Sequence, residues 1–251
     1  MGAALLCALE GMLDSRTRLF LILAGVFSTC LIVGDIIGGK LIQAHVFGHP
    51  FTLTVGMIPF PVTFLLTDVL NEFYGKRAAR FVTLLGFGLA LLSYTFIFIA
   101  GSIPIAPMAL EPGWKGVTEG AFQNVFLGSQ RMIVASLCAY MVAQFVDIGV
   151  FHLLKRLTQN RLLWLRATGS TAVSQLIDTL VINVVAWTGI LGFETIVNII
   201  LSSYVLKVLI AIGLTPLVYL AHTLIERGLK MEPVKLDELS GAASPTTASS
   251  G

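Results

Sequence analysis

Three polar side chains lie close together in an otherwise apolar stretch of the sequence: Asp68, Asn71 and Glu72. Asp68 and Glu72 are four residues apart, so a helix places them on one face, with Asn71 on the neighbouring strip. Carboxylates and an amide in this arrangement can accept hydrogen bonds from the N–H groups of a ligand. Two alternatives stay open: Glu72 can pair with Lys76 one turn later, and Asp68 can have a purely structural role.

A second polar group follows one stripe of a helix expected further along the chain. Thr171, Gln175 and Asp178 stand at positions i, i+4 and i+7, and present a hydroxyl, an amide and a carboxylate. Lys207 lies at a depth similar to that of Asp178 if the two helices are antiparallel neighbours. The two charges then form either a structural ion pair or a pair that lines a ligand cavity.

Other charges within or beside apolar segments also need an explanation, because a charge at the centre of a bilayer costs about 2.5–3.5 kcal/mol on insertion scales. Asp35 lies in the first apolar segment and Arg131 begins the fourth. Asp147 lies towards the end of the fourth segment, where an ion pair with Lys155 or Arg156 would account for it.

The composition indicates what kind of element holds these residues in position. Of the 251 residues, 56% are hydrophobic and 12% are charged, and the mean hydropathy is +0.88, far from the balance of soluble domains. A helix needs about 20 apolar residues to cross a bilayer. Six such segments are found, at residues 19–43, 51–73, 79–103, 131–154, 167–190 and 195–225. The sequence therefore predicts an all-α membrane protein, a polytopic bundle of six transmembrane helices.

Two of these segments are expected to be irregular. Glycines, together with Asp35 and Lys40, interrupt the second half of the first segment. Pro59 and Pro61 should break or kink the helix of the second segment. At least one helix is therefore expected to be broken, with Asp68 to Glu72 beyond the break.

The lysines and arginines predict the orientation of the bundle. If six helices alternate in direction, twelve of the 16 basic residues fall on one side of the membrane. The positive-inside rule places that side, and with it both termini, in the cytoplasm. The expected divisions are a cytoplasmic N-terminal segment at residues 1–18, a six-helix transmembrane domain at 19–230 and a disordered cytoplasmic tail at 231–251.

The sequence contains no signature of catalysis. The four histidines and three cysteines have no metal-ligand spacing, and neither a phosphate-binding glycine loop nor a catalytic triad is recognisable. We expect neither an enzyme nor a bound cofactor or metal ion. Since the basic clusters are interpreted as topology determinants, nothing indicates nucleic-acid binding.

With these residues in view, the chain resembles the queuosine precursor transporter family, also called the vitamin uptake transporter family. That family is related to the substrate-binding subunits of energy-coupling-factor importers. The resemblance covers residues 19–230. It is carried by FLLTDVLNEFYGKRAAR at 64–80, GSTAVSQLIDT at 169–179 and SYVLKVLIAI at 203–212, with support from QRMIVAS at 130–136.

The resemblance implies import of 7-deazaguanine bases, such as the cyano form (preQ0) or the aminomethyl form (preQ1), across the cytoplasmic (inner) membrane of a bacterium for tRNA modification. A carboxylate can accept the adjacent N–H groups of a guanine-like edge, and an aminomethyl ammonium calls for a second carboxylate. Phe64, Tyr94 or Trp187 could stack on the base. The substrate-binding residues that the resemblance implies are Asp68, Asn71, Glu72, Gln175, Asp178 and Lys207, with weaker support for Arg131 and Asp35.

Two mechanisms remain open. The first is a solitary carrier that works by alternating access around a site at the membrane midplane. The alternative is a vitamin-type substrate-binding subunit of an energy-coupling-factor importer, which needs a separate ATPase module. A structural membrane protein without a ligand is disfavoured by the cost of burying so many acids. The expected partners are a purine-like base and the lipid bilayer, and the sequence leaves a homodimer open.

Overall fold

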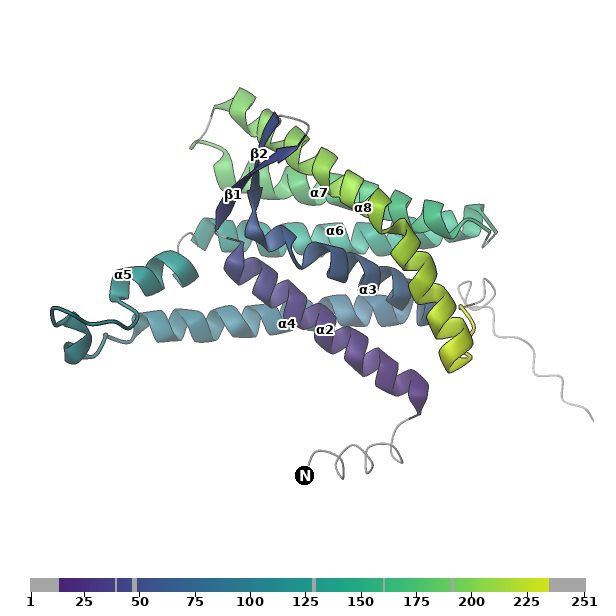
Figure 1. The fold of residues 1–251 in the computed structure, drawn as a ribbon, viewed down its shortest axis with the longest axis horizontal. Coiled ribbons are helices and arrows are strands. Elements are labelled where there is room, and N and C mark those ends of the chain that lie inside the picture. Colours follow the sequence, from purple (N-terminus) through teal and green to yellow (C-terminus); the bar gives the residue numbers. More distant parts are fainter. Residues whose placement is uncertain are drawn as a thin grey trace, which may run out of the picture.

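A bundle of helices forms most of this computed structural model, which describes residues 14–38, 40–46, 49–127, 130–159, 161–190 and 192–234 (Figure 1). The long helices are α2 (Ser15–Ile37), α4 (Gly75–Ser102), α6 (Gln130–Leu157), α7 (Leu163–Trp187) and α8 (Phe193–Leu229). A shorter helix, α3 (Phe60–Phe73), lies between them. The loop after α4 contains the short helices η2 (Pro107–Leu110), α5 (Glu119–Phe122) and η3 (Gln123–Leu127).

Within the described residues, four helices are long and apolar enough to cross a membrane: α2, α4, α8 and the Ile133–Leu157 part of α6. This composition identifies the chain as a multi-pass membrane protein. α7 is not among the four. α3 has 14 residues and is therefore about 21 Å long, less than the hydrocarbon core of about 30 Å. Six spans remain a prediction.

The first two predicted segments, 19–43 and 51–73, are not helical throughout. α2 ends at Ile37, and the chain then forms an antiparallel hairpin of β1 (Leu41–Val46) and β2 (His49–Thr54). The pairing runs from Leu41 opposite Thr54 to Val46 opposite His49. This hairpin contacts α8 at one end of the bundle, which we call the hairpin end (Figure 1). The opposite end, where α3 stops and α4 begins, is called the basic end.

The prediction that Pro59 and Pro61 break a helix is wrong, because both prolines lie where α3 begins. Pro59 is the N-cap residue and Pro61 is in the first turn. Backbone N–H groups in the first turn have no partner within the helix, so proline costs little there. The prolines therefore start a short helix after the turn η1 (Val55–Met57).

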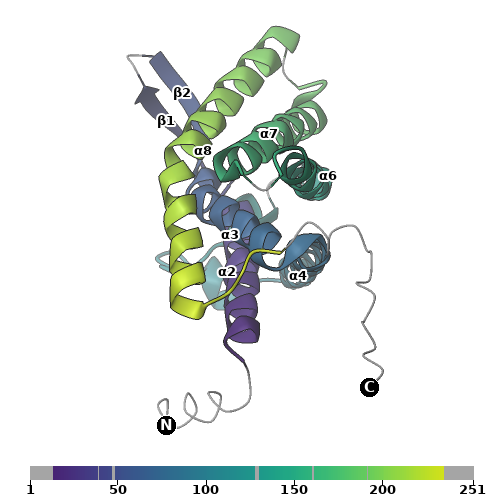
Figure 2. The same ribbon diagram turned by 90° about the vertical axis from the view of Figure 1, so that its right-hand side faces the viewer.

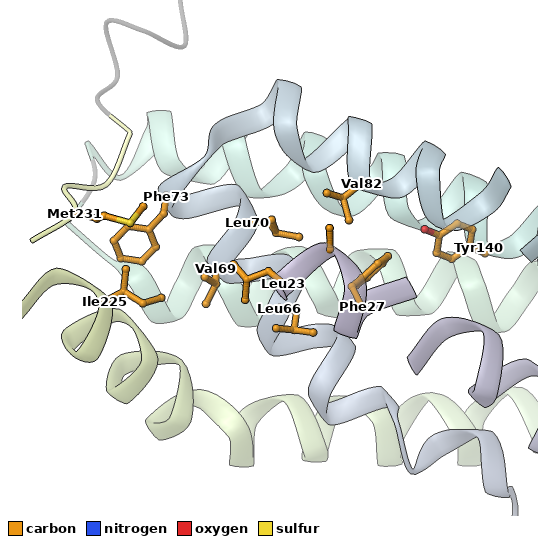
Figure 3. Packing of buried hydrophobic residues seen from close by; sticks show 11 residues of the cluster. Leu23, Phe27, Leu66, Val69, Leu70, Phe73, Val82, Tyr140, Ile225 and Met231 are labelled. Atoms are coloured by element: carbon orange, nitrogen blue, oxygen red, sulfur yellow. The ribbon is translucent and has the colours of Figure 1, made fainter. Parts of the chain in front are cut away.

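α3 is the central helix of the bundle and packs against α2, α4, α6 and α8 (Figure 2). Every residue at positions 66–73 is buried, which marks a helix covered on all sides. Its apolar residues Leu66, Val69, Leu70 and Phe73 join a cluster with residues of α2, α4, α6 and α8 (Figure 3). Phe64 joins a second cluster with α7 and α8. Polar residues of α3 are thereby held at fixed positions inside the protein.

The basic end of α3 is closed by the segment that follows α8. The Val234 N–H donates to the Glu72 carbonyl oxygen at 2.9 Å, which satisfies a carbonyl of the last turn. Met231 is also buried there. The start of the predicted tail at 231 thus packs against the bundle. Residues 235–251 of that tail, and residues 1–13 of the predicted N-terminal segment, lie outside the described residues.

Candidate functional site

One face of α3 carries the residues that the sequence analysis singles out first. Phe60, Phe64, Asp68 and Glu72 follow each other at intervals of four residues, so they form one stripe about 18 Å long. We call it the α3 stripe. The rings of Phe60 and Phe64 stack with centroids 6.4 Å apart, and the two carboxylates continue towards the basic end. Asn71 lies beside the stripe.

The middle of the stripe contains polar atoms without a partner. Asp68 is 2% exposed and Asn71 is 0% exposed. Within the described residues, neither carboxylate oxygen of Asp68 and neither amide atom of Asn71 has a hydrogen-bond partner. The charge of Arg166 attracts the Asp68 carboxylate, whereas Asp147 and Glu72 repel it. Buried polar groups normally find partners because an unmade hydrogen bond is costly, so the unpartnered atoms of Asp68 and Asn71 are exceptional.

Glu72, one turn further, is paired with two cations, although only its Oε1 atom accepts a hydrogen bond among the described residues. Arg166 Nη2 donates to Glu72 Oε1 at 2.7 Å, and Lys155 Nζ lies 3.2 Å from Oε2. The Lys155 and Arg166 side chains are 0% and 2% exposed. His222 Nε2 lies 3.8 Å from Oε1. This network joins α3, α6, α7 and α8 at the basic end.

The network answers one question that the sequence left open and corrects one interpretation. The partners of Glu72 are Lys155 and Arg166 rather than Lys76. These two cations are buried, so the basic clusters are not only topology determinants. Asp147 also differs from expectation, since it accepts a hydrogen bond from Ser174 Oγ at 3.1 Å instead of pairing with Lys155.

The predicted pair between α7 and α8 is present near the hairpin end. Lys207 Nζ donates to Asp178 Oδ2 at 2.7 Å and to Thr179 Oγ1 at 3.3 Å. Both charged side chains are partly exposed, at 15% and 17%. Lys207 also lies 6.0 Å from the centre of the Phe60 ring, within cation–π range. It therefore meets the first residue of the α3 stripe.

The remaining predicted residues are less closely gathered. Asp35 of α2 accepts a hydrogen bond from Ser136 Oγ at 2.8 Å, and the charge of Asp178 acts on it. Gln175 has a buried carbonyl oxygen without a partner in the described part of the chain. Arg131 belongs to α6, but its side chain lies outside the described residues. Among those described, no group of three or more His, Cys, Asp or Glu could hold a metal ion.

Sequence reasoning missed three members of the network: Lys155, Arg166 and His222. Arg166 carried a usable signal, because apolar residues flank it on both sides, at 162–165 and at 167. A charge in such a run calls for a buried partner. Lys155 had none, since its neighbour Arg156 makes it look like part of a surface cluster.

Comparisons with known proteins show the family to which the chain belongs. A family model described as "Putative vitamin uptake transporter" matches residues 54–221, which include all of α3 and the paired residues of α6, α7 and α8 except His222. The "Probable queuosine precursor transporter" of Bacillus subtilis (strain 168) is 35% identical over 175 residues, or 69% of this chain and 73% of that protein. The "Queuosine precursor transporter" of Escherichia coli (strain K12) is 34% identical over 178 residues, or 68% and 73%.

The chain therefore belongs to the vitamin uptake transporter family, which confirms the resemblance described above. These relatives are named as transporters, in agreement with the prediction that the chain is not an enzyme. None of these names refers to a subunit of an ATPase-driven importer, so the comparisons do not support that alternative. No solved structure matches the chain.

Proposed function

We propose that this protein imports queuosine precursors, 7-deazaguanine bases in the cyano or aminomethyl form, across the cytoplasmic membrane of a bacterium. The names of its relatives support this cargo. The observation that carries the proposal is the Asp68 carboxylate beside the Asn71 amide, both buried at the centre of the bundle and without a partner among the described residues.

The chemistry of a guanine-like edge matches these two side chains. Its ring N–H and exocyclic amino group can donate a parallel pair of hydrogen bonds to the Asp68 carboxylate. The neighbouring carbonyl oxygen of the base can accept from the Asn71 amide. Phe64 lies one turn before Asp68 on the same stripe, which favours it over Tyr94 or Trp187 as the ring that stacks on the base.

An aminomethyl group would add a positive charge to the cargo. Asp147 is the second carboxylate suited to it, because its charge already acts on Asp68 and it is held by a hydrogen bond from Ser174. A cationic cargo would relieve the repulsion between Asp68 and Asp147. This arrangement favours the aminomethyl form over the uncharged cyano form.

Two ion-pair layers that flank Asp68 support alternating access as the mechanism of the proposed carrier. The Asp178–Lys207 pair lies towards the hairpin end, and the Glu72 network lies towards the basic end. Separating one layer while the other stays closed would expose the central acid to one side at a time. In this mechanism the basic end and both termini face the cytoplasm, α7 crosses the membrane, and the hairpin with α3 forms the remaining span.

The test is uptake of a labelled aminomethyl deazaguanine into liposomes that contain only this protein. We expect saturable uptake without ATP, inhibited by excess cyano base. Adenine should not compete, because its edge does not present the paired donors of guanine.

The matched control is a liposome with the Asp178→Asn variant, in which the hairpin-end pair is lost and uptake should fall. Uptake that requires an added ATPase module would contradict the solitary carrier, and absence of binding would contradict the cargo.

A further inference from the structure

A cavity of about 220 Å³ lies away from the α3 stripe, between the start of α4 and the last turns of α6. It is lined by Lys76, Gly149, His152, Leu153 and Arg156. Three of these five side chains are basic and none is acidic. Because it belongs to the basic end of the bundle, the cavity faces the boundary between the membrane and water.

His152 is an unusual lining residue because it is buried without a partner. Its side chain is 4% exposed, and neither ring nitrogen has a hydrogen-bond partner in the described part of the chain. The cationic groups that act on the imidazole are Lys76, Lys155 and Arg156, and the one anionic group is Glu72. Arg166 and Lys155 already neutralise Glu72. The buried imidazole therefore faces a positively charged cavity.

Exposed apolar side chains lie beside the cavity on α6. Leu153 is 55% exposed and Leu157, one turn further along α6, is 70% exposed. A cationic pocket that opens beside exposed leucines suits an amphiphile better than a free anion, because its two parts would meet matching surfaces.

We propose that this cavity binds the phosphate headgroup of an anionic glycerophospholipid. Lys76 and Arg156 face the phosphodiester as cations, and His152 donates a ring N–H to one of its oxygens. Gly149 leaves room for the headgroup, and the acyl chains lie along Leu153 and Leu157. Since none of these residues belongs to the α3 stripe, the lipid site and the substrate site can be tested separately.

The experiment measures the melting temperature of the full-length protein in a neutral detergent, with phosphatidylglycerol, phosphatidylcholine or inorganic phosphate added. We expect only phosphatidylglycerol to raise the melting temperature, because a ligand stabilises the folded state to which it binds. The Lys76→Gln/Arg156→Gln double variant should lose at least half of that rise. His152→Phe, which fills the cavity without removing a lysine or arginine, should lose it as well.

The matched control is the Arg77→Gln/Arg80→Gln double variant, which removes two exposed arginines from the same end of α4. It should keep the full rise. An equal loss in this control would indicate general attraction between charges and would overturn the site. An equal rise with phosphatidylcholine or with inorganic phosphate would also overturn it. Binding of the deazaguanine base, measured on the same samples, shows that each variant is folded.

Discussion

At the scale of single residues, Asp68 and Glu72 are acids one helical turn apart with opposite surroundings. Asp68 has no partner among the described residues, and Glu72 has two buried cations. The carboxylate of Glu72 is therefore occupied by the protein itself, whereas that of Asp68 is available to a ligand. This difference assigns the two residues to different roles in the proposed carrier: Asp68 contacts the cargo, and Glu72 holds the helices together at the basic end.

Asp68→Asn should weaken binding without weakening the fold. The amide keeps the shape of the side chain and removes a buried charge that has no partner, so the melting temperature should stay equal or rise. The paired, charge-assisted hydrogen bonds to the base would be lost, at a cost of about 3 kcal/mol or roughly a hundredfold in Kd. Binding of a labelled deazaguanine and thermal unfolding, measured together, check both parts. Unchanged affinity would remove Asp68 from the site.

Glu72→Gln should have the opposite effect and destabilise the protein strongly. It leaves Lys155 and Arg166 buried without a counter-charge, and breaking a buried ion pair costs about 3–5 kcal/mol. Glu226→Gln is the matched control, because Glu226 also lies near His222, at 3.4 Å, but is 44% exposed. Its loss should cost less than about 1 kcal/mol. Similar unfolding of the two variants in one detergent would disprove a structural role for the Glu72 network.

The sequence reveals the acids better than it reveals their partners. Helical spacing was enough to place Asp68 with Glu72, and to put Asp178 at the depth of Lys207, because both arguments use only distance along a helix. It could not pair Glu72 with Arg166, which is 94 residues away. That contact depends on which helices are neighbours, and a single sequence does not contain this information.

At the scale of elements, the turn between α3 and α4 depends on Gly75. Its φ angle is +75°, in the left-handed region that costs other residues about 1–2 kcal/mol. A methyl group there would only touch Val234 at an ordinary 3.5 Å, so the requirement is conformational rather than steric. The glycine ends α3 and lets α4 start at once, which holds Glu72 at the basic end.

Gly75→Ala should therefore lower the free energy of unfolding by about 1–2 kcal/mol. Gly88→Ala in the same helix is the control. A methyl group at Gly88 meets no other atom within 4 Å, and alanine favours a helix by up to about 1 kcal/mol over glycine. The two substitutions should thus change stability in opposite directions. Equal melting temperatures would show that the backbone of the turn is not strained by alanine.

The hairpin shows why the first two segments were assigned incorrectly. Length and hydrophobicity suggested helices at 19–43 and 51–73, since both stretches are long enough to cross a membrane. The weaker signal was an alternation of polar and apolar residues, with polar side chains at Gln43 and His45 and again at Thr52 and Thr54. A period of two indicates strands, but four or five residues give it little weight beside twenty apolar ones.

At the scale of the whole molecule, the orientation can be tested by labelling single cysteines. Glu111→Cys places a thiol in the loop between α4 and α6, and Gln159→Cys places one between α6 and α7; both positions are exposed. The background variant has Cys7, Cys30 and Cys138 replaced by serine. A membrane-impermeant maleimide should label residue 111 in intact cells, and residue 159 only after permeabilisation, if the basic end faces the cytoplasm as the positive-inside rule predicts. Labelling of both thiols in intact cells would contradict this topology.

The bond from Val234 to the Glu72 carbonyl has a consequence for how the protein is made. A ribosome releases α3 long before it reaches Arg166, and it reaches residue 234 only after all of α8 has been synthesised. Until residue 234 is made, the last turn of α3 has an unsatisfied carbonyl, and Glu72 lacks its partners Lys155 and Arg166 until the end of α6 and the start of α7 have been made. The central helix is therefore among the earliest parts of the bundle to be translated and among the last to be completed.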